Sequence, residues 1–114
     1  MASLKRILFL IPITLAGCGD GISDASYDEA MIREAYCIVA SLRFGLYEEA
    51  EEHHEHGLEA GRLRFEQTNE LNDFSKILQD VRLATTNLSK DFHAEYLATR
   101  CNRNITVGEF ENAD

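Results

Sequence analysis

The sequence has few residues that break helices. Its 114 residues include a single proline, Pro12, and only seven glycines. Beyond Pro12 no residue locks φ or removes a backbone N–H donor, so long helices are permitted in the rest of the chain. Ala, Leu, Glu and Arg, which favour helices, are common between Ser23 and Arg103. The length allows one small domain, and the composition predicts that this domain is all-α.

Basic residues are also in short supply. The chain has 11 Lys and Arg residues against 20 Asp and Glu residues, a net charge of −9. Lys5 and Arg6 lie in residues 1–17, which contain no acidic residue, so loss of this segment would make the protein still more acidic. A field of this sign repels phosphate backbones and attracts basic proteins or cations. We therefore expect no nucleic-acid partner.

The chain lacks an apolar run long enough to cross a membrane. Its longest run, residues 7–15 with the sequence ILFLIPITL, follows Lys5 and Arg6. Nine residues of helix cover about 14 Å, whereas the hydrocarbon core of a bilayer is about 30 Å thick. A short positive segment followed by a short apolar run is typical of a secretory signal peptide.

The end of this segment carries a more specific motif. Leu15-Ala16-Gly17-Cys18 resembles the lipobox of bacterial lipoproteins, and all four positions fit that pattern. The resemblance implies that the signal peptide, residues 1–17, is removed and that Cys18 becomes a lipidated N-terminus carrying diacylglycerol and palmitate. Two or more acyl chains anchor a protein stably in a membrane. The alternative is an ordinary secretory signal in which Cys18 has no role.

The residue after Cys18 bears on which membrane of the cell envelope the lipoprotein is expected to occupy. In such lipoproteins Asp at this position retains the protein in the inner membrane, but here the residue is Gly19. The resemblance therefore favours the outer membrane of the cell envelope, with the protein facing the periplasm. Residues 18–25 would form the lipidated tether.

Two cysteines remain, Cys37 and Cys101. An even pair in an exported protein predicts a disulfide bond. The loop that it closes corresponds to about 4 kcal/mol in the chain-entropy model. The alternatives are two free buried thiols or two thiols that bind a metal. Cys37 lies in the apolar run EAYCIVA, which argues against a catalytic thiolate.

Three segments repeat apolar residues every three or four positions, the spacing of one helix face. The first is 26–44, with Met31, Ala35, Ile38, Val39 and Leu42. The second is 46–67, with Tyr47, Ala50, His54, Leu58, Gly61 and Phe65. The third extends to residue 100 and contains Leu71, Phe74, Leu78, Val81, Thr85, Leu88, Phe92 and Tyr96.

These segments predict a small antiparallel three- or four-helix bundle over residues 26–103, tied by one disulfide. The third segment is either continuous through residues 87–90 or interrupted there, where Asn87 or Ser89 would restart it. Gly57 and Gly61, four residues apart, would let a neighbouring helix approach closely. After Cys101 the periodicity is lost, and we expect residues 104–114 to form a flexible tail.

The run EEAEEHHEHG, residues 48–57, contains three histidines. Helical spacing places Glu49, Glu52, His53 and His56 on one face. Imidazoles and carboxylates are ligands for Zn²⁺, Ni²⁺ or Cu²⁺. This face lies opposite the apolar face, so we expect it to point to solvent, where ligands from one helix form only a weak divalent transition-metal site. His54 projects with the apolar face and is expected to be half-buried, as a hydrogen-bonded residue at the core.

The sequence contains no arguable Ser/His/Asp arrangement, no Gly-rich phosphate loop and no convincing carboxylate pair for acid–base chemistry. We therefore expect no enzymatic activity and no resident cofactor. The predicted function is that of a small, acidic, membrane-anchored periplasmic lipoprotein that binds a protein partner, as an envelope accessory, exclusion or immunity factor. The alternative is a metal-binding lipoprotein that uses the Glu/His face of the second helix.

Overall fold

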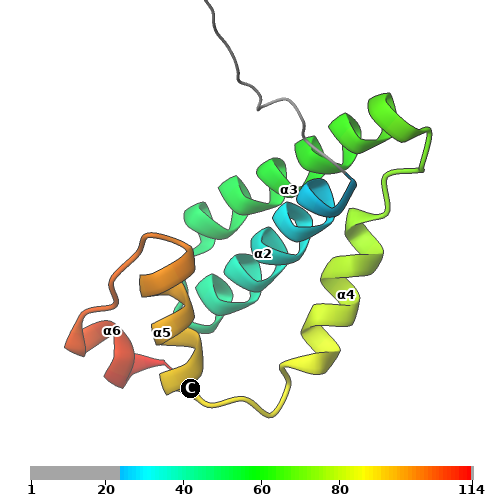
Figure 1. The fold of residues 1–114 in the computed structure, drawn as a ribbon. Helices are drawn as coiled ribbons and strands as arrows, with labels where there is room; N and C mark the ends of the chain where they lie inside the picture. The colour runs from blue at the N-terminus through cyan, green and yellow to red at the C-terminus, as the bar shows by residue number, and fades with distance from the viewer. Residues whose placement is uncertain (1–23, 114) are drawn as a thin grey trace, which may run out of the picture.

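The computed structural model describes residues 24–113, in which the chain forms helices and no strand (Figure 1). The helices are α2 (Asp24–Arg43), α3 (Tyr47–Thr68), α4 (Phe74–Ala84), α5 (Lys90–Arg100) and α6 (Val107–Asn112). The predicted all-α class and the helical bundle are confirmed. The predicted signal peptide, Cys18 and tether residues 18–23 lie outside the described residues. Each helix of the described part is too short or too polar to span a bilayer.

Helix α2 is the centre of the bundle. Figure 1 shows α3 running along one side of α2, α4 on its other side, and α5 near the end of α2 that leads into α3. The predicted core residues Met31, Ala35 and Ile38 are buried, with 0–3% of their surface exposed, and Val39 and Leu42 pack against the same cluster. The predicted apolar face of the first helix is therefore confirmed.

A tight turn joins α2 to α3. The N–H of Phe44 donates to the carbonyl of Ser41 and the N–H of Gly45 to that of Leu42, so the helix closes with short-range bonds. Gly45 has a φ of 74°, a conformation that glycine adopts without a steric penalty. The predicted break between segments 26–44 and 46–67 is confirmed, and Gly45 lies in it.

The predicted inward face of α3 is confirmed at its small residues, Ala50 and Gly61, but is wrong at its large ones. Tyr47 is 70% exposed, and Leu58 and Phe65 are each about two-fifths exposed. The buried residues of α3 are instead mostly small: Ala50, Gly57, Ala60, Gly61 and Arg64. Small side chains let α3 lie close to its neighbours. The free energy gained by burying the large residues of α2 and α4 then exceeds the free energy lost by leaving the large residues of α3 exposed.

The close approach expected at the two glycines is present. A Cβ added to Gly57 would lie 2.1 Å from Cζ of Phe74, whose side chain is fully buried. A Cβ added to Gly61 would lie 2.2 Å from Oδ1 of Asn72, and the amide nitrogen of Asn72 donates to the carbonyl of Leu58. Side chains beside and within α4, rather than a helix backbone, fill the space that the glycines leave.

The third predicted segment is interrupted between α4 and α5. Ser89 caps α5, and its hydroxyl accepts the N–H of Phe92. Phe74, Val81 and Thr85 are buried as predicted, whereas Leu71 precedes α4 and is 78% exposed. Of the two alternatives, the interrupted helix restarted at Ser89 is the one confirmed.

The Cys37–Cys101 disulfide is present, with an S–S distance of 2.10 Å and a Cα–Cα distance of 5.9 Å. It links the middle of α2 to the residue that ends α5. Thus the predicted pairing is confirmed, and the alternatives of free or metal-bound thiols do not apply.

Helix α6 corrects the expectation of a tail over 104–114. Thr106 and Glu109 form a capping box, in which each side chain accepts the backbone N–H of the other residue. Phe110 lies against Phe44 with ring centroids 6.1 Å apart, and Lys90 donates to the carbonyl of Phe110. A helix of six residues is too short to show an apolar period, but its capping box is readable in the sequence.

Candidate functional site

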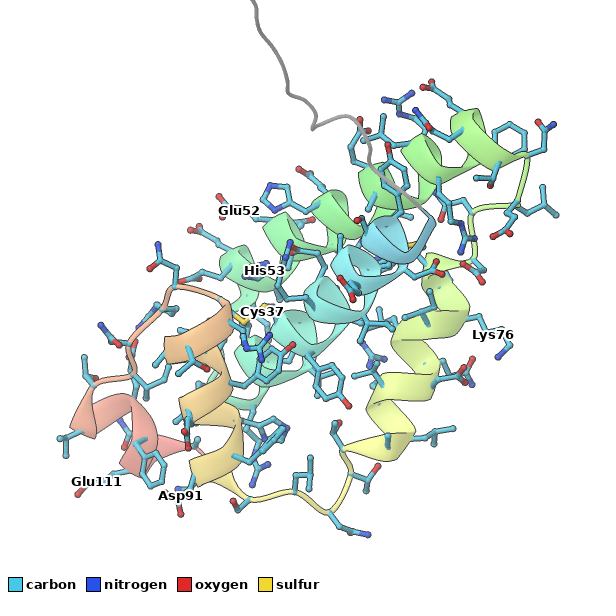
Figure 2. The ribbon with its side chains drawn as sticks, viewed as in Figure 1. Cys37, Glu52, His53, Lys76, Asp91 and Glu111 are labelled. Carbon is cyan, nitrogen blue, oxygen red and sulfur yellow. A yellow bond between two sulfur atoms is a disulfide. The ribbon has the colours of Figure 1, made fainter. Side chains whose placement is uncertain are left out.

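Helix α3 carries two distinct groups of polar residues. On its outer side five carboxylates are exposed: Glu48, Glu51, Glu52, Glu55 and Glu59. We call these residues the acidic face. Figure 2 shows Glu52 on the outer side of α3, whereas His53 lies toward α2.

The acidic face is poorly neutralised by the rest of the molecule. Glu59 pairs with Arg62 at 2.6 Å, but within residues 24–113 no ion pair reaches Glu48, Glu51, Glu52 or Glu55. These four residues repeat at helical spacings of three and four. Like charges at that spacing destabilise a helix by a few tenths of a kcal/mol per pair, roughly 0.2–0.5. A positively charged neighbour would therefore reduce the repulsion between the carboxylates of the acidic face.

The four residues predicted to share a metal-binding face are divided by the fold. Glu49 pairs with Arg103, and Oε2 of Glu49 lies 3.2 Å from Nε of Arg103. Glu52 is exposed. His53 and His56 face α2, where they meet Glu34. The prediction of one solvent-facing Glu/His face is therefore wrong, because α3 is rotated so that part of this face lies against α2.

Glu34 and the two histidines form a compact cluster between α2 and α3. Oε1 of Glu34 lies 2.6 Å from Nδ1 of His53 and 3.8 Å from Nδ1 of His56. The side chains of Glu34, His53 and His56 are 8%, 18% and 67% exposed. The cluster therefore runs from the interior at Glu34 to the surface at His56.

The surroundings of Glu34 favour its ionised form. Burial alone would raise its pKa, but hydrogen bonds from His53 and Arg33, together with their charges, outweigh burial and hold the pKa below the usual value of a glutamic acid. Arg33 donates to Oε2 at 3.0 Å, which leaves Oε1 for the histidines. Because a carboxylate only accepts hydrogen bonds, Nδ1 of His53 is the donor in the 2.6 Å contact.

His53 also lies beside the disulfide. One of its ring nitrogens and the sulfurs of Cys37 and Cys101 are all within 4.8 Å of one another. Metals bind thiolates, and a closed disulfide offers none. Of the metal-ligating groups in this region, only the Glu34, His53 and His56 set is usable in the oxidised protein.

Sequence reasoning missed Glu34. A signal was present, because Glu34 interrupts the buried face of α2 between Met31 and Ala35. A charged residue in that position requires a partner when it is buried. His54 was placed correctly: it is half-buried, and its ring meets that of Phe74 edge-on at 5.7 Å.

A second buried polar contact has a structural role. Arg43 of α2 donates to the carbonyl of Leu88 at 3.1 Å and to Nδ1 of His93 at 3.0 Å. His93 is 2% exposed, and burial, reinforced by the charge of Arg43, lowers its pKa below the ordinary value. This contact fixes the start of α5 to the end of α2.

Comparisons with protein-family models, curated proteins and solved structures find no match to this chain.

Proposed function

We propose that this protein is a lipid-anchored, non-enzymatic factor of the bacterial envelope that binds a basic segment of another protein through the acidic face of α3. One observation carries the proposal: Glu48, Glu51, Glu52 and Glu55 are exposed along one helix without an ion pair in the described part of the chain. A positively charged partner would relieve their mutual repulsion.

The acidic face is suited to fast and selective association. Fixed charges of one sign steer an oppositely charged partner and raise its association rate more than its final affinity. Exposed apolar residues on the same helix supply contact area, because Tyr47 lies one turn before Glu51 and Leu58 lies one turn after Glu55. Protein interfaces commonly combine such apolar contacts with a charged rim.

The lipid anchor supports the same proposal. The lipobox resemblance at Leu15–Cys18 implies a diacylglyceryl group on Cys18, and the membrane would then hold the domain close to proteins of the same surface. Confinement raises the effective concentration of a partner, so a modest affinity suffices. We propose the outer membrane, facing the periplasm, as the location.

Two matched variants test the proposal. The first replaces Glu48, Glu51, Glu52 and Glu55 with Gln. The control neutralises the same number of exposed acids elsewhere, at Glu29, Asp91, Glu95 and Glu111. A partner recovered from detergent-solubilised envelopes should be lost from the first variant, retained by the control, and released by raised salt. Equal recovery by both variants would contradict the proposal.

The anchor has its own test. Cells that produce the protein are labelled with radioactive palmitate, beside cells that produce the Cys18→Ser variant. Label should enter the wild-type protein alone, because the acyl chains require the Cys18 thiol. Labelling that persists in the variant would refute the assignment of Cys18.

A further inference from the structure

We propose that Glu34, His53 and His56 form a binding site for a divalent transition-metal ion, with Zn²⁺ as the expected occupant. This site borders the acidic face at Glu59 but uses none of its carboxylates as a ligand, and it does not depend on the protein partner. It replaces the single-helix set of Glu49, Glu52, His53 and His56, because the fold supplies a ligand from a second helix.

The spacing of the ligand atoms fits a small ion. One oxygen of Glu34 and one nitrogen from each histidine all lie within 4.8 Å of one another. Zinc binds nitrogen and carboxylate oxygen at about 2.0–2.2 Å, which puts neighbouring ligand atoms roughly 3.4 Å apart. The two separations from Oε1 of Glu34, 2.6 Å to His53 and 3.8 Å to His56, lie on either side of that value, so each of them reaches it with a shift of less than an ångström. His56 is 67% exposed and is able to move.

The types of ligand also fit. Two imidazoles and one carboxylate leave a fourth position for water in a tetrahedral site, an arrangement that Zn²⁺ accepts. Copper(II) would bind the same nitrogen ligands more strongly in a direct comparison, because affinity rises toward copper in the first transition row.

Glu34 is prepared for this role by its surroundings. It is a buried carboxylate, and attraction between opposite charges is stronger where water is excluded. Arg33 holds Oε2 and thereby orients Oε1 toward the two histidines. Partners of this kind, one step removed from the ion, fix the orientation of a ligand.

Binding requires one change of proton position. In the ion-free structure Nδ1 of His53 carries the proton that it donates to Glu34. The ion takes the place of this proton: Nδ1 releases its proton to solvent while Nε2 takes one up, so the ring binds the ion as a neutral ligand with its single proton on Nε2. No oxidation or reduction is involved, and the disulfide beside His53 stays closed.

An ion at this position would remain accessible. A surface groove of about 450 Å³ borders the cluster and is lined in part by Glu34, His56 and Glu59. The groove provides a route for the ion and room for the water molecule in the fourth position. Glu59 adds a further negative charge at its edge.

Calorimetric titration of the full chain with Zn²⁺, in detergent and with its disulfide intact, tests the inference. We expect one ion per chain. The His56→Ala variant should bind at least about tenfold more weakly, since loss of a ligand costs no less than loss of a residue that orients one. His56 is exposed, so this variant should fold normally. Glu34→Gln should have the same effect, with helix content checked by circular dichroism.

The control is the Glu49→Gln/Glu52→Gln double variant, which removes the carboxylates of the single-helix set and leaves the proposed site intact. Its affinity for Zn²⁺ should match that of the wild type. Absence of stoichiometric binding, unchanged binding by His56→Ala, or loss of binding in the control alone would each overturn the inference. None of these outcomes bears on the acidic face, which loses its partner only when Glu48, Glu51, Glu52 and Glu55 are neutralised together.

Discussion

Replacing Gly57 with Ala tests how α3 packs. A new Cβ would lie 2.1 Å from Cζ, 2.3 Å from Cε1 and 2.6 Å from Cε2 of Phe74. These distances are far below van der Waals contact, and the ring of Phe74 is completely buried. Either Phe74 leaves its position in the core or α3 moves away from α4.

The expected size follows from two opposing effects. Overpacking of a core costs about 1–3 kcal/mol, and the upper end applies because three ring atoms conflict at once. Ala is better than Gly inside a helix by about 1 kcal/mol. We therefore expect Gly57→Ala to lower the free energy of unfolding by about 2 kcal/mol.

Urea denaturation followed by circular dichroism measures this change. Phe74→Leu provides the partner for a double-mutant cycle, because a smaller side chain leaves room for the new methyl group. Gly57→Ala should then be neutral or stabilising, so the coupling energy between the two positions is about 2 kcal/mol. Gly108→Ala is the control, since no atom lies within 4 Å of its added Cβ. A Gly57→Ala protein as stable as the wild type would refute the packing account.

Three further predictions concern the disulfide, a helix cap and a buried histidine. Cys37→Ser/Cys101→Ser should lower the free energy of unfolding by about 4 kcal/mol, because the bond spans 64 residues; a urea midpoint unchanged from the wild type would contradict this. Ser89→Ala should cost about 1 kcal/mol through loss of the cap on α5, and thermal melting beside Ser75→Ala, an exposed serine without a capping role, measures it. His93 has a lowered pKa when folded, so the unfolded chain binds more protons and stability falls as the pH drops below the usual histidine value of 6.5. Urea denaturation between about pH 8 and about pH 5 should show a smaller loss of stability in His93→Gln than in the wild type. Equal slopes of stability against pH in the two proteins would exclude His93 as the cause.

The α2–α3 boundary and the start of α5 were predictable from local signals in the sequence. Gly45 ends the α2–α3 turn because its φ of 74° suits glycine, and Ser89 restarts the chain as a helix cap. The disulfide was predictable because the lipobox resemblance assigns Cys18 to a lipid, and that expectation leaves a single pair of cysteines. Each of these signals depends on one residue or on a count, and needs no knowledge of how helices are arranged.

The rotation of α3 was not predictable in the same way. Its large apolar residues, including Leu58 and Phe65, marked one face, but Gly57 and Ala60 determine which face fits against Phe74 and α2. Steric fit between helices depends on their mutual register, which periodicity within one helix does not contain. The Glu34–His53 contact was missed for the same reason, because it forms only when α3 has this rotation.

Photo-crosslinking in intact cells tests the central claim most directly. A photoreactive residue is placed at Glu52, on the acidic face, or at Asp91, an exposed acid of α5. The account predicts a discrete adduct with one basic envelope protein from position 52, its loss when Glu48, Glu51 and Glu55 are changed to Gln, and no such adduct from position 91. The absence of a discrete adduct at position 52, or the same adduct from both positions, would contradict it.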